Sequence, residues 1–302
     1  MGDVLVLGDV GLDVVVHTAA PVAHGTDTSA RIRLLPGGAG ANVAAGLASE
    51  GLTVTMVGCV GADGGAATAA MLRDRGVRVR LRTVPTASTG TVVVLVGADG
   101  ERSMASDRGA NLHLRATDVP NALLAAHRHL HVSGYALFGP PRDAALGALR
   151  RARDLGLTVS LDPASVAPLQ GYGPSRFRAD VAGCDLLLPN AEEAALLTGC
   201  RDPAGAALDL STEHTRVAVT CGVHGAVWVT GGNVRRAPAV PTLVVDTVGA
   251  GDAFAAGAIA GLLTGAGDEQ CLARGLAAAA RCVRTVGAQQ QDADPATHGR
   301  GA

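Results

Sequence analysis

The chain has 302 residues and a formal net charge of -2, so it is long enough to bury a full core and too nearly neutral for a nucleic-acid partner. All 25 basic residues are arginine. A Walker A loop and a protein-kinase active site are therefore excluded, because each holds ATP with a lysine. Any phosphate chemistry must rely on backbone amides, arginine side chains and metal ions.

Six cysteines are scattered through the chain without a CxxC pair, which is typical of reduced thiols in a cytosolic protein. No apolar run approaches the length of about 18 residues that a membrane span needs. The N-terminus enters directly as a strand, without a basic flank. These features predict a soluble, cytoplasmic protein with no membrane partner.

The first predicted strand, Val4 to Leu7, ends at Gly8 and Asp9, and Asp13 lies just beyond it. Open α/β sheets place ligand-binding groups past the carboxyl end of such a strand. The carboxylate of Asp13 could accept hydrogen bonds from two neighbouring hydroxyls of a ligand. The alternative is an ordinary turn aspartate.

Two separated stretches, 12–36 and 88–108, contain extended segments rather than a convincing helix. Thr28 to Leu35 is typical of a strand with arginines on one side, and the second stretch reads as two strands joined by a hairpin turn at Ala98-Asp99-Gly100. Together they predict a small sheet that folds over the main domain as a lid and excludes water. Edge strands of the main sheet are the alternative.

The glycine-rich loop between these stretches, Pro36-Gly37-Gly38-Ala39-Gly40-Ala41-Asn42, opens a helix that runs to about Glu50. It is not a dinucleotide fingerprint, because Val43 stands where the third glycine would be. Glycines at a helix start let a small polar ligand touch the backbone, and Asn42 offers both a donor and an acceptor. Gly38 and Asn42 are therefore candidate binding residues.

From Leu52 to about Asp209, predicted strands and helices alternate, which indicates a mainly parallel sheet with helices on both faces. No internal repeat or long linker divides the chain, so residues 1–302 are predicted to form one Rossmann-like α/β domain with the lid. Three histidines alternate at 127, 129 and 131, but two of them fall where a predicted helix ends. A metal site there is not expected, since no further ligand converges on them.

The strand Asp185 to Leu188 is followed by Pro189-Asn190-Ala191-Glu192-Glu193. Asn190 is a good helix N-cap and Glu193 stands at the capping-box position, so one interpretation is structural. In the functional interpretation, Asn190 and Glu193 hold a hydrated Mg²⁺, which prefers oxygen ligands and keeps its waters.

A further strand, Val217 to Thr220, runs into the glycine-bearing turn Cys221 to Gly225. The turn could hold the phosphates or the base of a nucleotide. It could equally be the bend of a β-hairpin.

The stretch Val244 to Leu262 has the most specific pattern in the chain. Its apolar start reads as the end of a buried strand, which leads into Asp246 and then the turn Gly249-Ala250-Gly251. Amides of such a turn, with the positive end of the following helix, bind anions such as phosphate. Asp252 in the first helical turn should stay ionised and could accept a hydroxyl proton during phosphoryl transfer. The alternative is a tight turn with Asp252 as a helix stabiliser.

In order and spacing, these motifs resemble the ribokinase-like, or PfkB, family of carbohydrate kinases over about residues 4–292. The resemblance rests on Gly37 to Asn42, Asn190 to Glu193, Thr220-x-Gly222-x-x-Gly225 and Asp246-Thr-Val-Gly-Ala-Gly-Asp252-Ala-Phe254. It implies a Rossmann-type α/β domain with a β lid that often pairs two subunits, and hence a homodimer through the lid. It also implies ATP and Mg²⁺ as cofactors.

The resemblance further implies roles for single residues. Asp252 matches the catalytic base, which takes a proton from the substrate hydroxyl as that oxygen attacks the γ-phosphate of ATP. The family's anion hole corresponds to Gly249, Ala250 and Gly251. Its sugar-binding positions correspond to Asp13, Gly38 and Asn42. Its magnesium and phosphate positions correspond to Asn190 and Glu193, and its nucleotide contacts to Thr220, Gly222 and Gly225.

The sequence departs from the family in two places. Members activated by potassium use Asp246, the backbone at Val248 and a C-terminal G-A-Q-P-S run, which here reads Gly287-Ala288-Gln289-Gln290-Gln291. Because glutamine replaces the serine, a potassium requirement is doubtful. The segment His131 to Tyr135 lacks the glutamate that ribose-specific members present to the sugar, so ribose is not favoured.

Four functions stay open. A sugar kinase is preferred over a nucleoside kinase, because neither lid stretch contains an aromatic residue to stack on a base. Arginines of the lid could instead bind the carboxylate of a keto-deoxy sugar acid, or they could be solvated or lie at a dimer contact; they are Arg31, Arg33, Arg102 and Arg108. A non-catalytic ligand-binding regulator on this fold is the remaining class.

Overall fold

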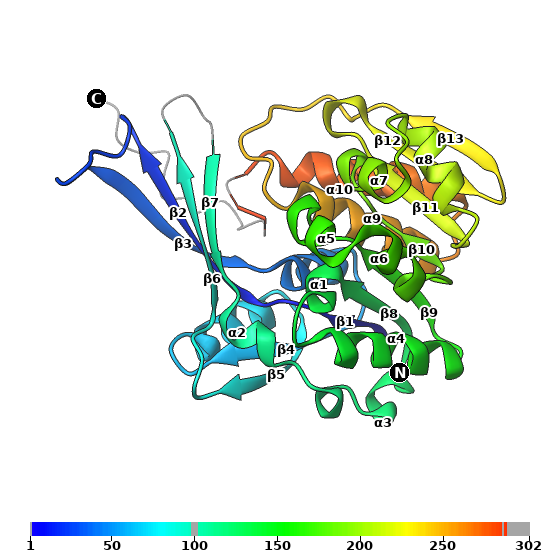
Figure 1. Cartoon of the computed structure of the whole chain (residues 1–302), viewed down its shortest axis with the longest axis horizontal. Coiled ribbons are helices and arrows are strands. Elements are labelled where there is room, and N and C mark those ends of the chain that lie inside the picture. Colours follow the sequence, from blue (N-terminus) through cyan, green and yellow to red (C-terminus); the bar gives the residue numbers. More distant parts are fainter. Residues whose placement is uncertain (1, 98–101, 286, 289–302) are drawn as a thin grey trace.

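The computed structural model describes residues 2–97, 102–285 and 287–288 of the chain (Figure 1). Its centre is a nine-stranded sheet formed by β1 (Gly2–Leu7), β4 (Val54–Gly61), β5 (Arg78–Val84), β8 (His127–Ser133), β9 (Thr158–Asp162), β10 (Leu186–Leu187), β11 (Arg216–Thr220), β12 (Ala226–Thr230) and β13 (Asn233–Ala237). The order across the sheet is β13-β12-β11-β10-β9-β8-β1-β4-β5. Neighbours are parallel from β11 to β5, and only the hairpins β11–β12 and β12–β13 are antiparallel.

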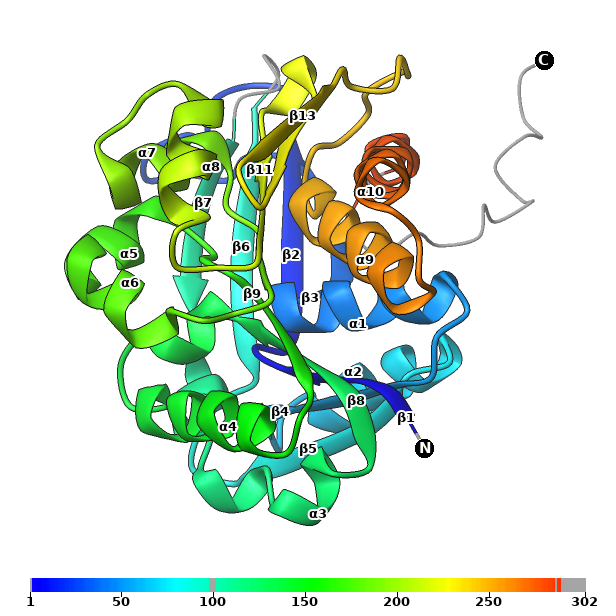
Figure 2. The same ribbon diagram turned by 90° about the vertical axis from the view of Figure 1, so that its right-hand side faces the viewer.

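Helices cover both faces of this sheet, as predicted (Figure 2). One face carries α1 (Ala39–Ser49), α2 (Gly65–Asp74), α9 (Ala250–Leu263) and α10 (Asp268–Cys282). The opposite face carries α3 (Asn121–Leu124), α4 (Arg142–Asp154), α5 (Val166–Tyr172), α6 (Pro174–Val181), α7 (Ala191–Thr198) and α8 (Pro203–Leu210). Short 3-10 turns are η1 (Gly109–His113), η2 (Ala116–Asp118), η3 (Gly134–Leu137) and η4 (Gly222–His224).

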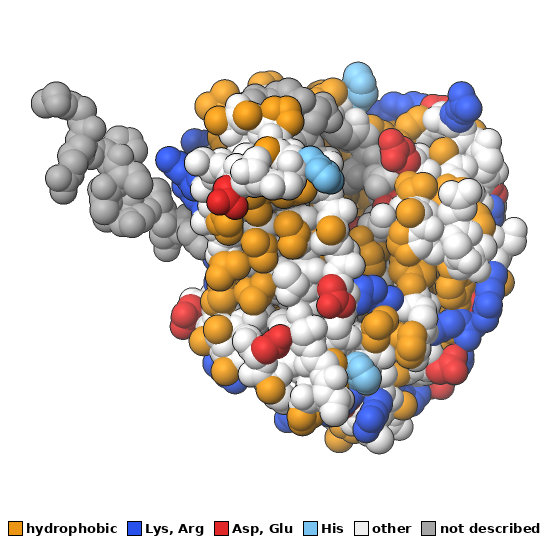
Figure 3. Space-filling model, turned by 60° about the vertical axis from the view of Figure 1, so that its left-hand side comes forward, with side chains coloured by type: hydrophobic (Ala, Val, Ile, Leu, Met, Phe, Trp, Pro, Cys, Tyr) orange, Lys and Arg blue, Asp and Glu red, His pale blue; other side chains and the backbone are white. Residues whose placement is uncertain are grey.

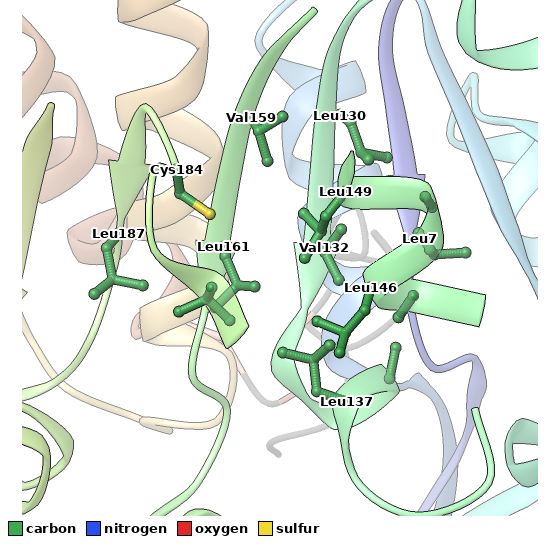
Figure 4. Close-up of a cluster of buried hydrophobic side chains, with 14 of the residues drawn as sticks. Leu7, Leu130, Val132, Leu137, Leu146, Leu149, Val159, Leu161, Cys184 and Leu187 are labelled. Carbon is green, nitrogen blue, oxygen red and sulfur yellow. The ribbon is translucent and has the colours of Figure 1, made fainter. Parts of the chain in front are cut away.

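The central strands are apolar throughout because both of their faces are covered. In β1, Val4 and Val6 pack toward α1 and α9, whereas Leu5 and Leu7 pack toward α4. Figure 4 shows the cluster on the α4 side of the sheet, in which Leu7 and its neighbours on β8 and β9 meet leucines of α4. The two cores hold the carboxyl ends of the parallel strands in fixed register, and the loops that leave those ends build the site.

A separate four-stranded sheet stands beside the main body (Figure 1). Its order is β3 (Ala30–Gly37), β2 (Gly11–Thr18), β6 (Gly90–Val96) and β7 (Arg102–Asp107). The predicted small sheet is therefore confirmed, and the alternative of edge strands in the main sheet is wrong. The predicted turn at 98–100 lies outside the described residues.

The small sheet has one buried and one exposed apolar side. Leu35, Val15 and Val94 form a small buried cluster, whereas Ile32 and Leu34 are 62% and 64% exposed. Figure 3 shows hydrophobic side chains gathered on the side of the molecule where this sheet lies. An exposed apolar face of this kind marks an interaction surface more often than a solvated one.

The prediction of a buried strand leading into Asp246 is wrong. Residues 238–245 form no strand, and Leu243 and Val244 are 79% and 54% exposed. Pro238 and Pro241 interrupt the stretch, and proline cannot donate to a sheet ladder. The apolar letters before Asp246 therefore belong to an extended surface segment.

The placement of two of the three alternating histidines at a helix end is also wrong. All three are buried in β8, where His127 contacts Thr55 and His129 contacts both Thr158 and Ser160. Among the described residues, no group of three His, Cys, Asp or Glu side chains could hold a metal ion. No helix within residues 2–97, 102–285 and 287–288 is long and apolar enough to span a bilayer.

Candidate active site

The glycine turn before α9 has no room for a larger residue at its first position, Gly249. Gly249 is the N-cap of α9 and has φ 78°, in the left-handed region that glycine tolerates. A Cβ there would lie 2.3 Å from the Cβ of Ala288. The buried carboxylate of Asp246 accepts hydrogen bonds from the amides of Val248 and Gly287 at 2.8 and 2.9 Å, which joins the two segments.

Asp252 lies in the first turn of α9 and contacts a residue that is remote in sequence. The side-chain amide of Asn42 donates to Oδ2 of Asp252 at 2.8 Å. Burial, followed by the negative charge of Asp162, raises the pKa of Asp252 well above its ordinary value, while the Asn42 hydrogen bond lowers it. These effects oppose the helix N-terminus, which was expected to keep this carboxylate ionised.

A cavity of about 150 Å³ lies against the glycine turn. It brings together seven predicted site residues: Asn190, Glu193, Thr220, Gly249, Ala250, Gly251 and Asp252. A larger cavity of about 520 Å³ lies at the Cys221 to Gly225 turn, but it is mostly apolar and contains none of the predicted site residues. The smaller cavity is the candidate active site because carboxylates and the glycine turn converge at it.

Asn190 and Glu193 form the predicted capping box of α7 and also face this cavity. The backbone amide of Asn190 donates to Oε2 of Glu193, and the backbone amide of Glu193 donates to Oδ1 of Asn190, both at 2.9 Å. Burial and then the charge of Asp162 raise the pKa of Glu193 to about 8. The structural interpretation is thus confirmed, and the same geometry leaves the Glu193 carboxylate at the cavity.

Asp162 is a site residue that the sequence reasoning missed. It ends β9 and lines the cavity, and burial, opposed by the Ala164 hydrogen bond, raises its pKa to about 6. The Ala164 amide donates to Oδ1 of Asp162 at 2.6 Å, with Ala164 at φ 79°, a strained value for a residue with a side chain. The signal that identified Asp13, a carboxylate past the end of a parallel strand, also fits Asp162.

Asp13 lies within β2, opposite Leu35 of β3, so the alternative of an ordinary turn aspartate is wrong; Gly38 joins β3 to α1. Asp13 is buried, and burial followed by the charges of Asp9 and Asp246 raises its pKa to about 7. Gly38 has φ 95°, and a Cβ there would lie 2.7 Å from the carbonyl oxygen of Asp9. The charge of Asp13 also contributes to the raised pKa of Asp252, so the two carboxylates influence one another across the site.

Thr220, Gly222 and Gly225 lie at the bend between β11 and β12. This turn is a β-hairpin bend, as the structural alternative predicted. Thr220 pairs with Asn190 through a β-bridge and lines the cavity, whereas Gly222 and Gly225 do not line it. The structure therefore brings Thr220 next to Asn190, and the nucleotide contacts of the two glycines stay predictions.

Tyr135 is an aromatic residue near the site that lies outside both lid stretches. It belongs to η3, and burial and the charges of Asp9, Asp162 and Asp252 raise its pKa. Neither lid stretch contains Phe, Tyr or Trp, and the body of the protein supplies this ring instead.

The chain is similar to known kinases in sequence and in structure. A fructokinase from Klebsiella pneumoniae is 35% identical over 272 residues, which cover 86% of this chain and 84% of that protein. The crystal structure of adenosine kinase from Sinorhizobium meliloti superposes with a TM-score of 0.87 at 27% identity and covers 96% of both chains. The structure of Arabidopsis thaliana ribokinase complexed with ribose and ATP gives a TM-score of 0.82 at 27% identity, with 95% of this chain and 94% of that one covered.

A model of the pfkB family carbohydrate kinases matches residues 1–295. The match includes both the main sheet and the small sheet, and it covers every residue of the cavity described above. Relatives with the names of sugar kinases support a phosphotransferase activity with an alcohol acceptor. The chain belongs to the pfkB family of carbohydrate kinases.

Proposed function

We propose that this protein transfers the γ-phosphoryl group of ATP to a hydroxyl of a small sugar. The observation that carries the proposal is the position of Asp252, which lies in the turn of amides at the start of α9 and is held by Asn42 at 2.8 Å. A proton acceptor beside an anion-binding turn supplies both parts of phosphoryl transfer to an alcohol.

Asp252 acts as the general base in this proposal. A raised pKa suits that task, because it makes the ionised carboxylate a stronger proton acceptor. The Asn42 amide favours the ionised form and orients the carboxylate toward the incoming hydroxyl. Asp13 accepts hydrogen bonds from sugar hydroxyls, and Gly38 lets the sugar approach the backbone.

The amides of Gly249 to Gly251 bind the transferring phosphate. First-turn amides of a helix lack an acceptor within the helix, and the helix dipole favours an anion beside them. The Ala250 amide already donates to the carbonyl oxygen of Thr247 at 3.3 Å. We therefore assign the larger share of this binding to the glycine amides on either side of it.

Glu193 and Asp162 fit a magnesium ion at the cavity, with Asn190 beside them. Glu193 is buried and Asp162 is half-buried, both have raised pKa values, and a divalent cation would offset the repulsion between their charges. Mg²⁺ prefers oxygen ligands and retains its waters, so these side chains would hold it largely through water. When bound, the ion supplies charge neutralisation for the phosphates.

Potassium is not part of the proposal. Both oxygens of the Asp246 carboxylate accept hydrogen bonds from amides. The glutamines at 289–291, where the family pattern has its distinctive serine, lie outside the described residues. We propose that turnover is similar in potassium and sodium buffers.

A nucleoside is the second candidate acceptor, and Tyr135 is the observation that favours it. Its ring lies close enough to the site to be influenced by three carboxylates and could stack on a base. A keto-deoxy sugar acid ranks lower, because Arg108 donates to the carbonyl oxygens of Phe138 and Tyr135, both at 2.6 Å. The side chain of Arg102 lies outside the described residues.

The small sheet serves as the lid in this proposal, and its exposed face forms a homodimer. Ile32 and Leu34 project from β3 with most of their surface open, and pairing two such faces would bury apolar area. A cytoplasmic location, where ATP is available, completes the proposal.

An ATP-consumption screen across pentoses, hexoses, sugar acids and nucleosides tests the acceptor class. We expect a sugar to give the highest kcat/KM, and a nucleoside well above every sugar would reverse the order of the two candidates. With the best acceptor, Asp252→Asn should reduce kcat by about 1000-fold or more with little change in nucleotide affinity. Nearly normal turnover in that variant would remove Asp252 as the base, whereas a wild-type protein without turnover on any acceptor of the screen would favour a non-catalytic regulator.

A further inference from the structure

We propose that Asp9 is a positioning residue for phosphoryl transfer: it fixes the start of α1 and thereby places Asn42 against Asp252. The inference rests on the proposed role of Asp252 as the base. Asp9 does not line the catalytic cavity. Its effect on the reaction passes through the helix that it holds.

Asp9 satisfies the first three amides of α1. Its Oδ2 accepts from Ala39 at 2.9 Å, its Oδ1 accepts from Gly40 at 3.3 Å, and its carbonyl oxygen accepts from Ala41 at 3.1 Å. The residue at the N-cap itself, Gly38, has no side chain for this purpose. A helix start normally receives such bonds from its own cap, so here a residue about 30 positions upstream takes that part.

The next residue of α1 after these three is Asn42. The backbone amide of Asn42 donates to the carbonyl oxygen of Gly38 at 2.9 Å, so the backbone of Asn42 belongs to the same turn. Its side chain reaches Oδ2 of Asp252 at 2.8 Å. Any displacement of the first turn of α1 therefore moves the group that orients the proposed base.

The start of α1 packs closely against the end of β1. A Cβ on Gly8 would lie 3.0 Å from Cα of Gly40, and a Cβ on Gly40 would lie 2.9 Å from Cα of Gly8. Ser133, at the end of the neighbouring strand β8, donates its hydroxyl to Oδ1 of Asp9 at 2.9 Å. Asp9 thus joins two central strands and α1 at one point.

The charge of Asp9 repels neighbouring carboxylates, which argues for more than a local cap. It contributes to the raised pKa values of Asp13, Asp162 and Asp252. A neutral acceptor would avoid this repulsion, but an amide side chain has only one acceptor oxygen for the Ala39 and Gly40 amides and the Ser133 hydroxyl. A carboxylate is the side chain that accepts from all three.

The test is a double-mutant cycle on kcat with Asp9→Asn and Asn42→Ala. We expect Asp9→Asn to lower kcat about 10- to 100-fold, the range in which a displacement of about 1 Å acts, with the KM for ATP within about twofold of wild type. If Asp9 acts through Asn42, the kcat of the double variant is no lower than that of the less active single variant. Multiplying losses in the double variant, or an unchanged kcat in Asp9→Asn, would overturn the proposal.

Two further variants serve as a control and as a second test of positioning. Asp202→Ala removes another aspartate that caps a helix, since Oδ2 of Asp202 accepts from the Gly205 amide at the start of α8. It should lower the melting temperature without lowering kcat. If Asp9→Asn does not fold, Ser133→Ala removes one of the anchors of Asp9, and its expected kcat loss of about threefold should likewise vanish in the Asn42→Ala background. A full threefold loss that persists there would count against positioning.

Asp252→Asn distinguishes a failure of the proposed base from a failure of the proposed role of Asp9. If that variant turns over normally, the proposed base is wrong, and the role of Asp9 in placing Asn42 against that base fails with it. If Asp252→Asn is inactive and the cycle is additive, the base assignment stands and only the role of Asp9 fails.

Discussion

Replacing Asp13 with asparagine should stabilise the protein above neutral pH. Burial raises the pKa of this carboxyl from 3.8 to about 7, so the folded state holds a proton that the unfolded chain releases. Stability is therefore highest below the unfolded pKa, and it falls as the pH rises from about 4 toward 7. A difference of about 3 pKa units sets a ceiling of about 4 kcal/mol, of which about 2.5 kcal/mol develops between pH 5 and pH 8.

The assay is urea unfolding of wild type and Asp13→Asn at about pH 5 and pH 8. Because the amide resembles the protonated carboxyl, we expect the variant to be more stable than wild type by about 1.5 kcal/mol at pH 5 and by about 4 kcal/mol at pH 8. Asp27→Asn, at an exposed position in a loop, is the control and should change neither value. Equal stabilities of wild type and Asp13→Asn at both pH values would refute the reasoning. The same variant should raise the KM for the acceptor about tenfold if Asp13 binds sugar hydroxyls.

Three other outcomes are expected. Glu193→Gln should raise the Mg²⁺ concentration for half-maximal turnover about tenfold, measured by a magnesium titration at fixed ATP, and an unchanged titration would contradict the metal assignment. Gly249→Ala should lower both the melting temperature and kcat because its methyl group would overlap a neighbouring residue, whereas Gly51→Ala, also at positive φ but in open space, should cost only about 1 kcal/mol. Leu34→Asp should convert a dimer into a monomer in light scattering, while the equally exposed Val22→Asp should not; a wild-type monomer would remove the dimer proposal.

The raised pKa values at the site have a common physical origin. Asp162, Glu193 and Asp252 lie around one cavity, and burial is the first cause of the raised pKa in each. Keeping three acids together costs stability unless a proton or a cation offsets their charge. The arrangement therefore favours ligand binding over the stability of the empty protein, which is consistent with the proposed binding of Mg²⁺ and ATP.

Local patterns in the sequence determined much of this protein. Strand and helix alternation predicted the mainly parallel sheet, and the extended stretches at 12–36 and 88–108 predicted the small sheet. Both are confirmed, because each depends on the periodicity of neighbouring residues. The Asn190 and Glu193 capping box is confirmed for the same reason, since all its bonds lie within four residues.

Only the tertiary structure decided which of these motifs meet. Asn42 and Asp252 are 210 positions apart, and their contact depends on the packing of α1 against α9. Asp162 and Tyr135 join the site through the ends of strands that the sequence does not order in space. The exposure of Val244 and the raised pKa of Asp252 likewise follow from surroundings, because burial is a property of the packed chain and not of a local motif.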